Sequence, residues 1–134
     1  MGRVRGYIDV GDRRLWALFE TGARNSYIMQ DAVGGLPTWT LVKPLNAPLG
    51  GASHTVRSEC ALVGGIEGYD FSVKARVIED LGVDEDGKRI DVLFGARAMQ
   101  DHGINVDVVD RRLDFSKFQF MRDLPEFSDG REAR

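Results

Sequence analysis

The sequence predicts a mostly β domain, built as a small closed or folded-over sheet with one short helix. Sixteen glycines against four prolines in 134 residues indicate many turns. Short runs of β-branched and aromatic residues, seven or more of them, lie between these turns, which is typical of small barrels and sandwiches. One segment, residues 96–102, combines helix formers with a glycine directly after it, Gly103.

The N-terminal strands form a predicted hairpin. Residues 7–10 and 15–19 are apolar or β-prone, and a glycine with several charged residues separates them. A loop at 20–23 follows, and its glycine can take unusual backbone angles. The sequence then predicts a short strand at 26–29 and a helical turn at 30–33.

The middle of the chain predicts a second group of strands around a flexible tip. Residues 38–48 are β-prone and then extended by two prolines, and a glycine-rich tip follows at 49–53. A turn at 64–70 separates the strand at 54–63 from the strand at 71–78. Apolar residues recur at period two in the last of these strands, so we expect it to be half buried.

The C-terminal third predicts a strand, the helix and a second hairpin. A short apolar strand at 90–94 ends at Gly95, and the helix at 96–102 comes next. The hairpin strands lie at 104–109 and 113–115.

Two polar segments flank this region. The acidic stretch at 84–87 lacks the ligand spacing of a calcium loop and predicts a solvated loop. From residue 122 onward the chain is charged and poor in apolar residues. We therefore expect one domain over residues 1–121 and a polar C-terminal tail at 122–134.

The composition argues against several classes of function. The 18 basic and 21 acidic residues are mixed along the chain with a net charge of −3, which does not favour nucleic-acid binding. Cys60 is the single cysteine and His54 and His102 are the only histidines, so we expect no disulfide, no metal and no cofactor. Without an apolar run of about 20 residues or a signal peptide, we expect no membrane segment and a cytoplasmic, reducing location.

Glu20 is the residue on which the functional hypothesis depends. It directly follows the apolar run at 15–19 and begins the tetrapeptide Glu-Thr-Gly-Ala at 20–23. A carboxylate at the end of a buried strand costs free energy unless the fold needs it there. The alternative is an ordinary hairpin turn with the carboxylate in solvent.

Three segments of the chain resemble the retropepsin-like aspartic proteases. Residues 18–28 resemble the active-site segment of that family, in which two apolar residues precede Asp-Thr-Gly-Ala. Residues 92–95 resemble the second family segment, an apolar run ending in glycine, and residues 96–115 match the helix and strand-turn-strand that follow it. Residues 49–53 lie where the family carries its glycine-rich flap tip. The resemblance covers roughly residues 4 to 118.

The resemblance implies a closed β-barrel-like acid protease fold, with one lobe per chain. Its chemistry needs two carboxylates that share one proton across a water molecule. This chain has Glu20 in place of the motif aspartate and supplies only one such carboxylate, so the resemblance implies a homodimer. Glu20, Thr21 and Gly22 would form the catalytic loop, with Thr21 bonded across the dimer axis.

The resemblance also implies a peptide or protein substrate, bound as an extended strand. The substrate-binding residues would be Ala23, Arg24 and Asn25 beside the catalytic loop, with Gly50, Gly51 and Ala52 at the flap tip. The glutamate side chain is longer than that of aspartate by one methylene, so two facing Glu20 side chains would be crowded. Two alternatives to an active endopeptidase therefore stay open: a catalytically impaired domain that binds peptides or dimerises, and a plain β interaction module.

Overall fold

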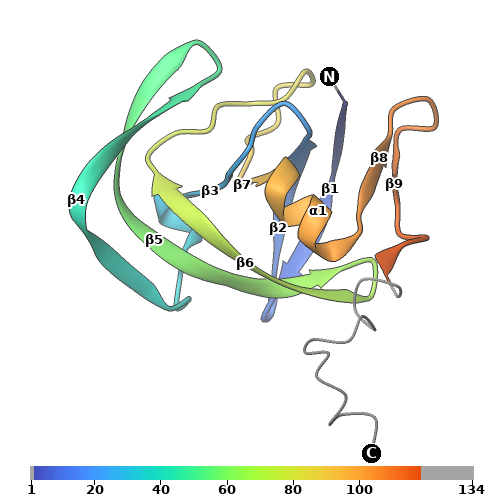
Figure 1. Cartoon of the computed structure of the whole chain (residues 1–134), viewed down its shortest axis with the longest axis horizontal. Coiled ribbons are helices and arrows are strands. Elements are labelled where there is room, and N and C mark those ends of the chain that lie inside the picture. Colours follow the sequence, from blue (N-terminus) through green and yellow to red (C-terminus); the bar gives the residue numbers. More distant parts are fainter. Residues whose placement is uncertain (1, 119–134) are drawn as a thin grey trace, which may run out of the picture.

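The computed structural model describes residues 2–118, and within them the chain forms nine strands, one short 3-10 helix and one α-helix (Figure 1). The elements are β1 (Arg3–Val10), β2 (Arg13–Glu20), β3 (Ser26–Met29), η1 (Gln30–Ala32), β4 (Thr38–Leu49), β5 (Ala52–Ile66), β6 (Tyr69–Ile78), β7 (Val92–Gly95), α1 (Ala96–His102), β8 (Asn105–Asp107) and β9 (Arg112–Asp114). The predicted mostly β composition with one short helix is confirmed. The predicted tail at 122–134 lies outside the described residues.

Seven of the strands form one sheet that closes on itself. Their order is β1-β2-β7-β3-β6-β5-β4, and β1 pairs again with β5 where Asp9 lies opposite Gly65. Strands β8 and β9 form a separate pair. The predicted closed, barrel-like sheet is therefore confirmed, and within the described part of the chain β4 is the strand at its free edge.

Strand β7 determines where the ends of the other central strands lie. It lies between β2, to which it is parallel, and β3, to which it is antiparallel. All four residues of β3 and of β7 are buried. The parallel register places Glu20, the last residue of β2, opposite Gly95, the last residue of β7.

Two apolar clusters lie on opposite faces of these central strands. Phe19 and Phe94 belong to the main core, where their ring centroids are 5.2 Å apart. Leu18 and Leu93, the preceding residues on the same two strands, belong to a second cluster with Tyr27. Because side chains alternate along a strand, β2 and β7 serve both clusters at once.

The predicted turn at 64–70 is wrong in extent. Strands β5 and β6 continue to Ile66 and Tyr69, and the turn is shorter. A β-carbon on Gly64 would lie 2.2 Å from the carbonyl oxygen of Asp9, so glycine lets β1 approach β5 closely enough to close the sheet. Gly64 therefore belongs to a strand interior, where it permits a close backbone contact.

The β4–β5 hairpin is longer than predicted and ends in a two-residue turn. Gly50 and Gly51 form this turn with φ angles of 59° and 81°, which favour glycine. Strand β4 is mostly exposed and contains Pro44 and Pro48. Its pairing with β5 shifts register between Thr40 and Leu45.

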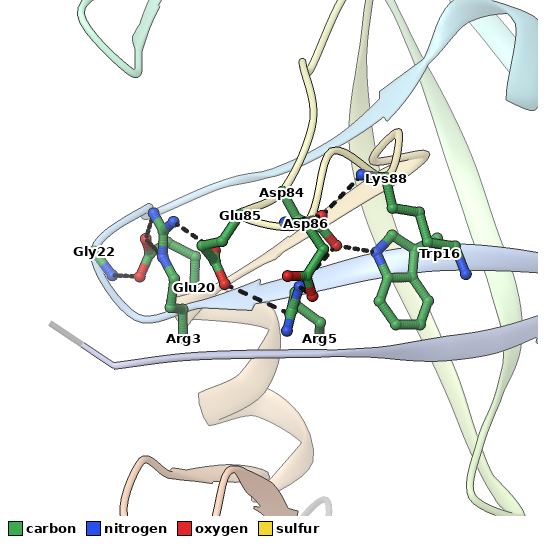
Figure 2. Close-up of polar contacts among 9 residues, drawn as sticks. All are labelled: Arg3, Arg5, Trp16, Glu20, Gly22, Asp84, Glu85, Asp86 and Lys88. Atoms are coloured by element: carbon green, nitrogen blue, oxygen red, sulfur yellow. Dashed lines mark hydrogen bonds and ion pairs between the residues drawn. The ribbon is translucent and has the colours of Figure 1, made fainter.

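Asp84 is not in a solvated loop, contrary to the prediction for 84–87. Its side chain is buried and accepts hydrogen bonds from the amides of Asp86 and Lys88 and from the Trp16 indole, at 2.9, 2.9 and 2.8 Å (Figure 2). Arg5 lies 3.1 Å from the same carboxylate. Burial alone would raise the pKa of Asp84, but these bonds lower it to about 2. The side chain fastens the loop after β6 to β1 and β2.

No helix in the described part of the chain has the length and the apolar character needed to cross a bilayer.

Replacement of Gly64 by alanine should destabilise the fold by about 1–3 kcal/mol, because the new methyl group would overlap the β1 backbone. Gly65→Ala is the matched control, since its β-carbon would meet nothing closer than the Tyr69 carbonyl oxygen at 3.7 Å. Urea unfolding of both variants measures the difference. Equal stability losses would contradict the close-approach explanation.

Asp84 should contribute a pH-dependent part of the stability. Because its folded-state pKa of about 2 lies below the ordinary aspartate value of about 3.9, the ionised side chain stabilises the fold at neutral pH. That contribution is lost as the pH falls from about 4 to about 2. Thermal unfolding should show a lower Tm for Asp84→Asn at pH 7 and a shallower loss of Tm below pH 4. Asp70→Asn, at an exposed carboxylate of β6, should behave like the unmodified chain.

Candidate active site

Glu20 is buried at the end of β2, with 8% of its surface exposed. Its neighbours in the sheet are Arg3 on β1 and Gly95 on β7. The alternative of a solvent-exposed carboxylate in an ordinary turn is therefore wrong. Glu20 is placed by two strand pairings, one from each side.

The Glu20 carboxylate is bound by an arginine and by the backbone of its own loop. Its Oε1 accepts hydrogen bonds from Arg3 Nε and Nη2, at 3.1 and 2.7 Å, and its Oε2 accepts one from the Gly22 amide at 3.3 Å (Figure 2). The Arg3 guanidinium also contacts Glu85 at 3.4 Å. The hydrogen bond to Glu20 raises the pKa of Arg3, so the guanidinium stays charged.

Thr21 is bonded within its own chain. Its hydroxyl accepts a hydrogen bond from the Gly2 amide at 2.8 Å and lies 3.0 Å from the Gly2 carbonyl oxygen, to which it can donate. The Thr21 amide donates to that same carbonyl oxygen at 2.9 Å. The resemblance implies a hydrogen bond from Thr21 across a dimer axis. To form it, the hydroxyl would have to give up its hydrogen bonds to Gly2 and bind the partner chain.

The loop after Glu20 is bound to the segment that contains Gly95. The amides of Ala96 and Arg97 donate to the carbonyl oxygens of Ala23 and Arg24, at 2.7 and 3.1 Å. The Gly95 amide donates to Ser26 Oγ at 3.0 Å. A β-carbon on Gly95 would lie 2.3 Å from the Asn25 carbonyl oxygen, so this position requires glycine. Two of the segments that resemble the protease family, residues 18–28 and 92–97, are therefore in direct contact.

A cleft of about 720 Å³ lies between this loop and the β4–β5 hairpin. Seven of the nine residues proposed from the sequence line it: Glu20, Gly22, Ala23, Arg24, Asn25, Gly50 and Ala52. Thr21 and Gly51 do not line it, although each is adjacent in sequence to residues that do. The structure thus brings the two predicted groups of residues to one cavity, and their roles stay predictions.

Sequence reasoning missed the apolar floor of the cleft and its charged rim. The floor includes Leu18, Tyr27 and Leu93 of the second apolar cluster. Leu18 and Leu93 each directly precede a phenylalanine on the same strand. Adjacent apolar residues on a strand indicate that both faces of the sheet are covered by apolar side chains. The remaining polar and charged lining residues are Arg3, His54, Arg76 and Asp80.

Arg3 also had a signal in the sequence. It and Glu20 are equally distant from the turn at Gly11-Asp12, so an ideal hairpin places them opposite each other. That inference needs the hairpin to extend over eight residues on each side, and the β-prone runs alone are shorter.

The arrangement offers a carboxylate for proton transfer and a cleft for an extended chain. Within residues 2–118 no group of three or more His, Cys, Asp or Glu side chains is placed to hold a metal ion. Glu20 and its neighbours can take part in hydrogen bonding, proton transfer and charge pairing.

Comparison with known proteins places the fold. No protein-family model and no curated protein matches the sequence. Among solved structures, the chain is similar to the retroviral protease-like domain of Ddi1 from Leishmania major, with a TM-score of 0.62 and 14% sequence identity over 87% of this chain and 90% of that chain. This likeness, together with the closed sheet and single short helix, shows that the chain has the retropepsin-like fold.

Proposed function

We propose that the chain is an aspartic-type endopeptidase that acts as a homodimer through paired Glu20 carboxyls. The observation that carries the proposal is the position of Glu20, buried at the end of β2 and lining the cleft under the β4–β5 hairpin. A carboxylate retained in such a place is typical of a site that uses it.

The reaction follows from two carboxyl groups that share one proton. The ionised Glu20 takes a proton from a water molecule as the water oxygen attacks the peptide carbonyl. The protonated Glu20 of the other chain hydrogen-bonds to the carbonyl oxygen and transfers its proton to it, which gives a tetrahedral diol. The first Glu20 then returns its proton to the amide nitrogen as the C–N bond breaks, and the second Glu20 regains a proton from the diol as the carbonyl of the new carboxylic acid forms. Each chain has one Glu20 at this loop, so the water must lie on a two-fold axis between two chains.

The cleft suits a peptide in extended conformation. Its floor is apolar, with Leu18, Tyr27 and Leu93, and would receive apolar side chains. Its upper wall is the tip of the β4–β5 hairpin, where Gly50 takes a positive φ angle. A peptide strand can add its backbone hydrogen bonds to such a site, and a hairpin tip can open and close over it.

The ion pair of Arg3 with Glu20 supports a second candidate, peptide binding without hydrolysis. The Arg3 guanidinium donates two hydrogen bonds to Glu20 Oε1, the shorter at 2.7 Å, and so occupies an oxygen that a shared proton or a bound water would need. Hydrolysis therefore requires Arg3 to move away from Glu20 on dimerisation or on substrate binding. About half of the Arg3 side chain is exposed, which leaves it room to move.

Glu20→Gln should reduce peptide cleavage by at least about 100-fold, because it removes the group that transfers the proton. Cleavage of a fluorogenic peptide library measures this, with circular dichroism to verify folding. Glu20→Asp is the companion variant: its restoration of the motif carboxylate should leave cleavage measurable. Light scattering should report a dimer.

Two results would contradict the proposed mechanism. One is equal cleavage by the Glu20→Gln variant. The other is a strict monomer that still cleaves peptides, since one chain cannot supply the pair of carboxyls.

Arg3→Gln should raise kcat/KM about three- to tenfold, because an ion pair that competes with proton sharing is removed. Arg14→Gln is the matched control: Arg14 faces Asp9 across the same hairpin, at the end far from Glu20, and its variant should leave kcat/KM unchanged. A fall in activity for Arg3→Gln alone would show that Arg3 supports catalysis and does not oppose it.

A further inference from the structure

A second cavity, of about 400 Å³, opens beside the cleft. Four basic side chains line it: Arg24 from the loop after Glu20, Lys74 and Arg76 from β6, and Arg97 from α1. They come from three separate parts of the sequence, so their convergence is a property of the fold.

These four cations lack acidic partners within the described part of the chain. None of them lies within 4.0 Å of a carboxylate oxygen of residues 2–118, whereas many other arginines do. The arginines with such a partner are Arg3, Arg5, Arg14, Arg89 and Arg112. Within residues 2–118, one cavity therefore gathers four cations that have no carboxylate partner, although the whole chain has a net charge of −3.

The acidic residues of the cavity do not balance this charge. Glu59 and Asp101 also line it. Glu59 is buried and accepts a hydrogen bond from the Trp39 indole at 3.2 Å. Two carboxylates face four cations, so the cavity has an excess of positive charge that favours an anion.

The cavity adjoins the proposed peptide cleft. Arg24, Asn25 and Arg76 line both of them. The guanidinium carbon of Arg76 lies 6.0 Å from the centroid of the ring of Tyr27, a residue of the cleft floor. Since successive side chains of an extended peptide point to opposite sides, one of them can enter this cavity while its neighbours contact the apolar floor.

We propose that this cavity is a subsite that binds an acidic side chain, aspartate or glutamate, of the peptide in the cleft. Guanidinium groups match the geometry of a carboxylate and bind it with two parallel hydrogen bonds. Arg24 and Arg76 contact the carboxylate, and Lys74 and Arg97 add to the positive field. The inference rests on the proposed role of the cleft as a peptide site, and it assigns acidic peptides as the substrate class.

Binding of fluorescent peptides to the Glu20→Gln variant tests the inference without the need for hydrolysis. The peptides are made in pairs, and the two members of a pair differ at one position, which is glutamate in one and glutamine in the other. A series of pairs moves this position along the peptide. At one position glutamate should bind about tenfold more tightly than glutamine. This preference should weaken as salt is added.

The double variant Arg24→Gln/Arg76→Gln should remove the preference. The double variant Arg14→Gln/Arg112→Gln loses the same charge away from the cavity and should retain it. Arg76→Glu should reverse the preference at that position, so that the glutamine peptide binds more tightly than the glutamate peptide. The single variants and the wild-type chain, measured before cleavage is detected, give the same comparison if a double variant or Glu20→Gln does not fold.

The outcomes separate this inference from the proposed reaction. If no position favours glutamate, or if both double variants lose the preference equally, the subsite assignment is wrong. Binding of inorganic phosphate at the arginines without any peptide preference would also overturn it. If glutamate is preferred while wild type and Glu20→Gln cleave equally, the subsite holds and the Glu20 mechanism fails.

Discussion

The placement of β7 between β2 and β3 is the constraint on which the candidate site depends. One short strand, hydrogen-bonded on both edges, holds the ends of two others and brings Glu20 beside Gly95. The absence of a side chain at Gly95 then lets the loop of Ala23 and Asn25 pack directly on its backbone. The Glu20 carboxylate is therefore positioned mainly by the backbone pairing of β2 with its two neighbouring strands.

Local sequence patterns predicted the elements that carry their own signal. Strand β3 and helix α1 have the predicted limits, since β-prone residues end at a turn and Gly103 ends the helix. Gly64 reads as a turn residue in the sequence, since glycine is common in turns. Its actual role is a close contact with β1, more than fifty residues away, which local sequence cannot reveal. Asp84 was assigned to solvent for a similar reason: its partners Trp16 and Arg5 are distant in sequence.

Two pairs of arginines in this chain have different surroundings. Arg3 and Arg5 join β1 to the loop that follows β6, and carboxylates there balance them. Arg24 and Arg76 also line cavities, as Arg3 does, but no carboxylate of residues 2–118 lies within 4.0 Å of them. Sequence alone shows both groups as scattered basic residues in a mixed pattern of charge. The folded structure is needed to tell which arginines have carboxylate partners and which have none among residues 2–118.

The prolines of β4 bear on how the chain behaves at high concentration. An exposed edge strand offers backbone groups to the edge of another molecule, and this is a common route to aggregation. Pro44 and Pro48 have no amide hydrogen to donate, and the register shift between Thr40 and Leu45 interrupts the regular edge. The outer edge of the hairpin is thus a poor template for intermolecular sheet formation.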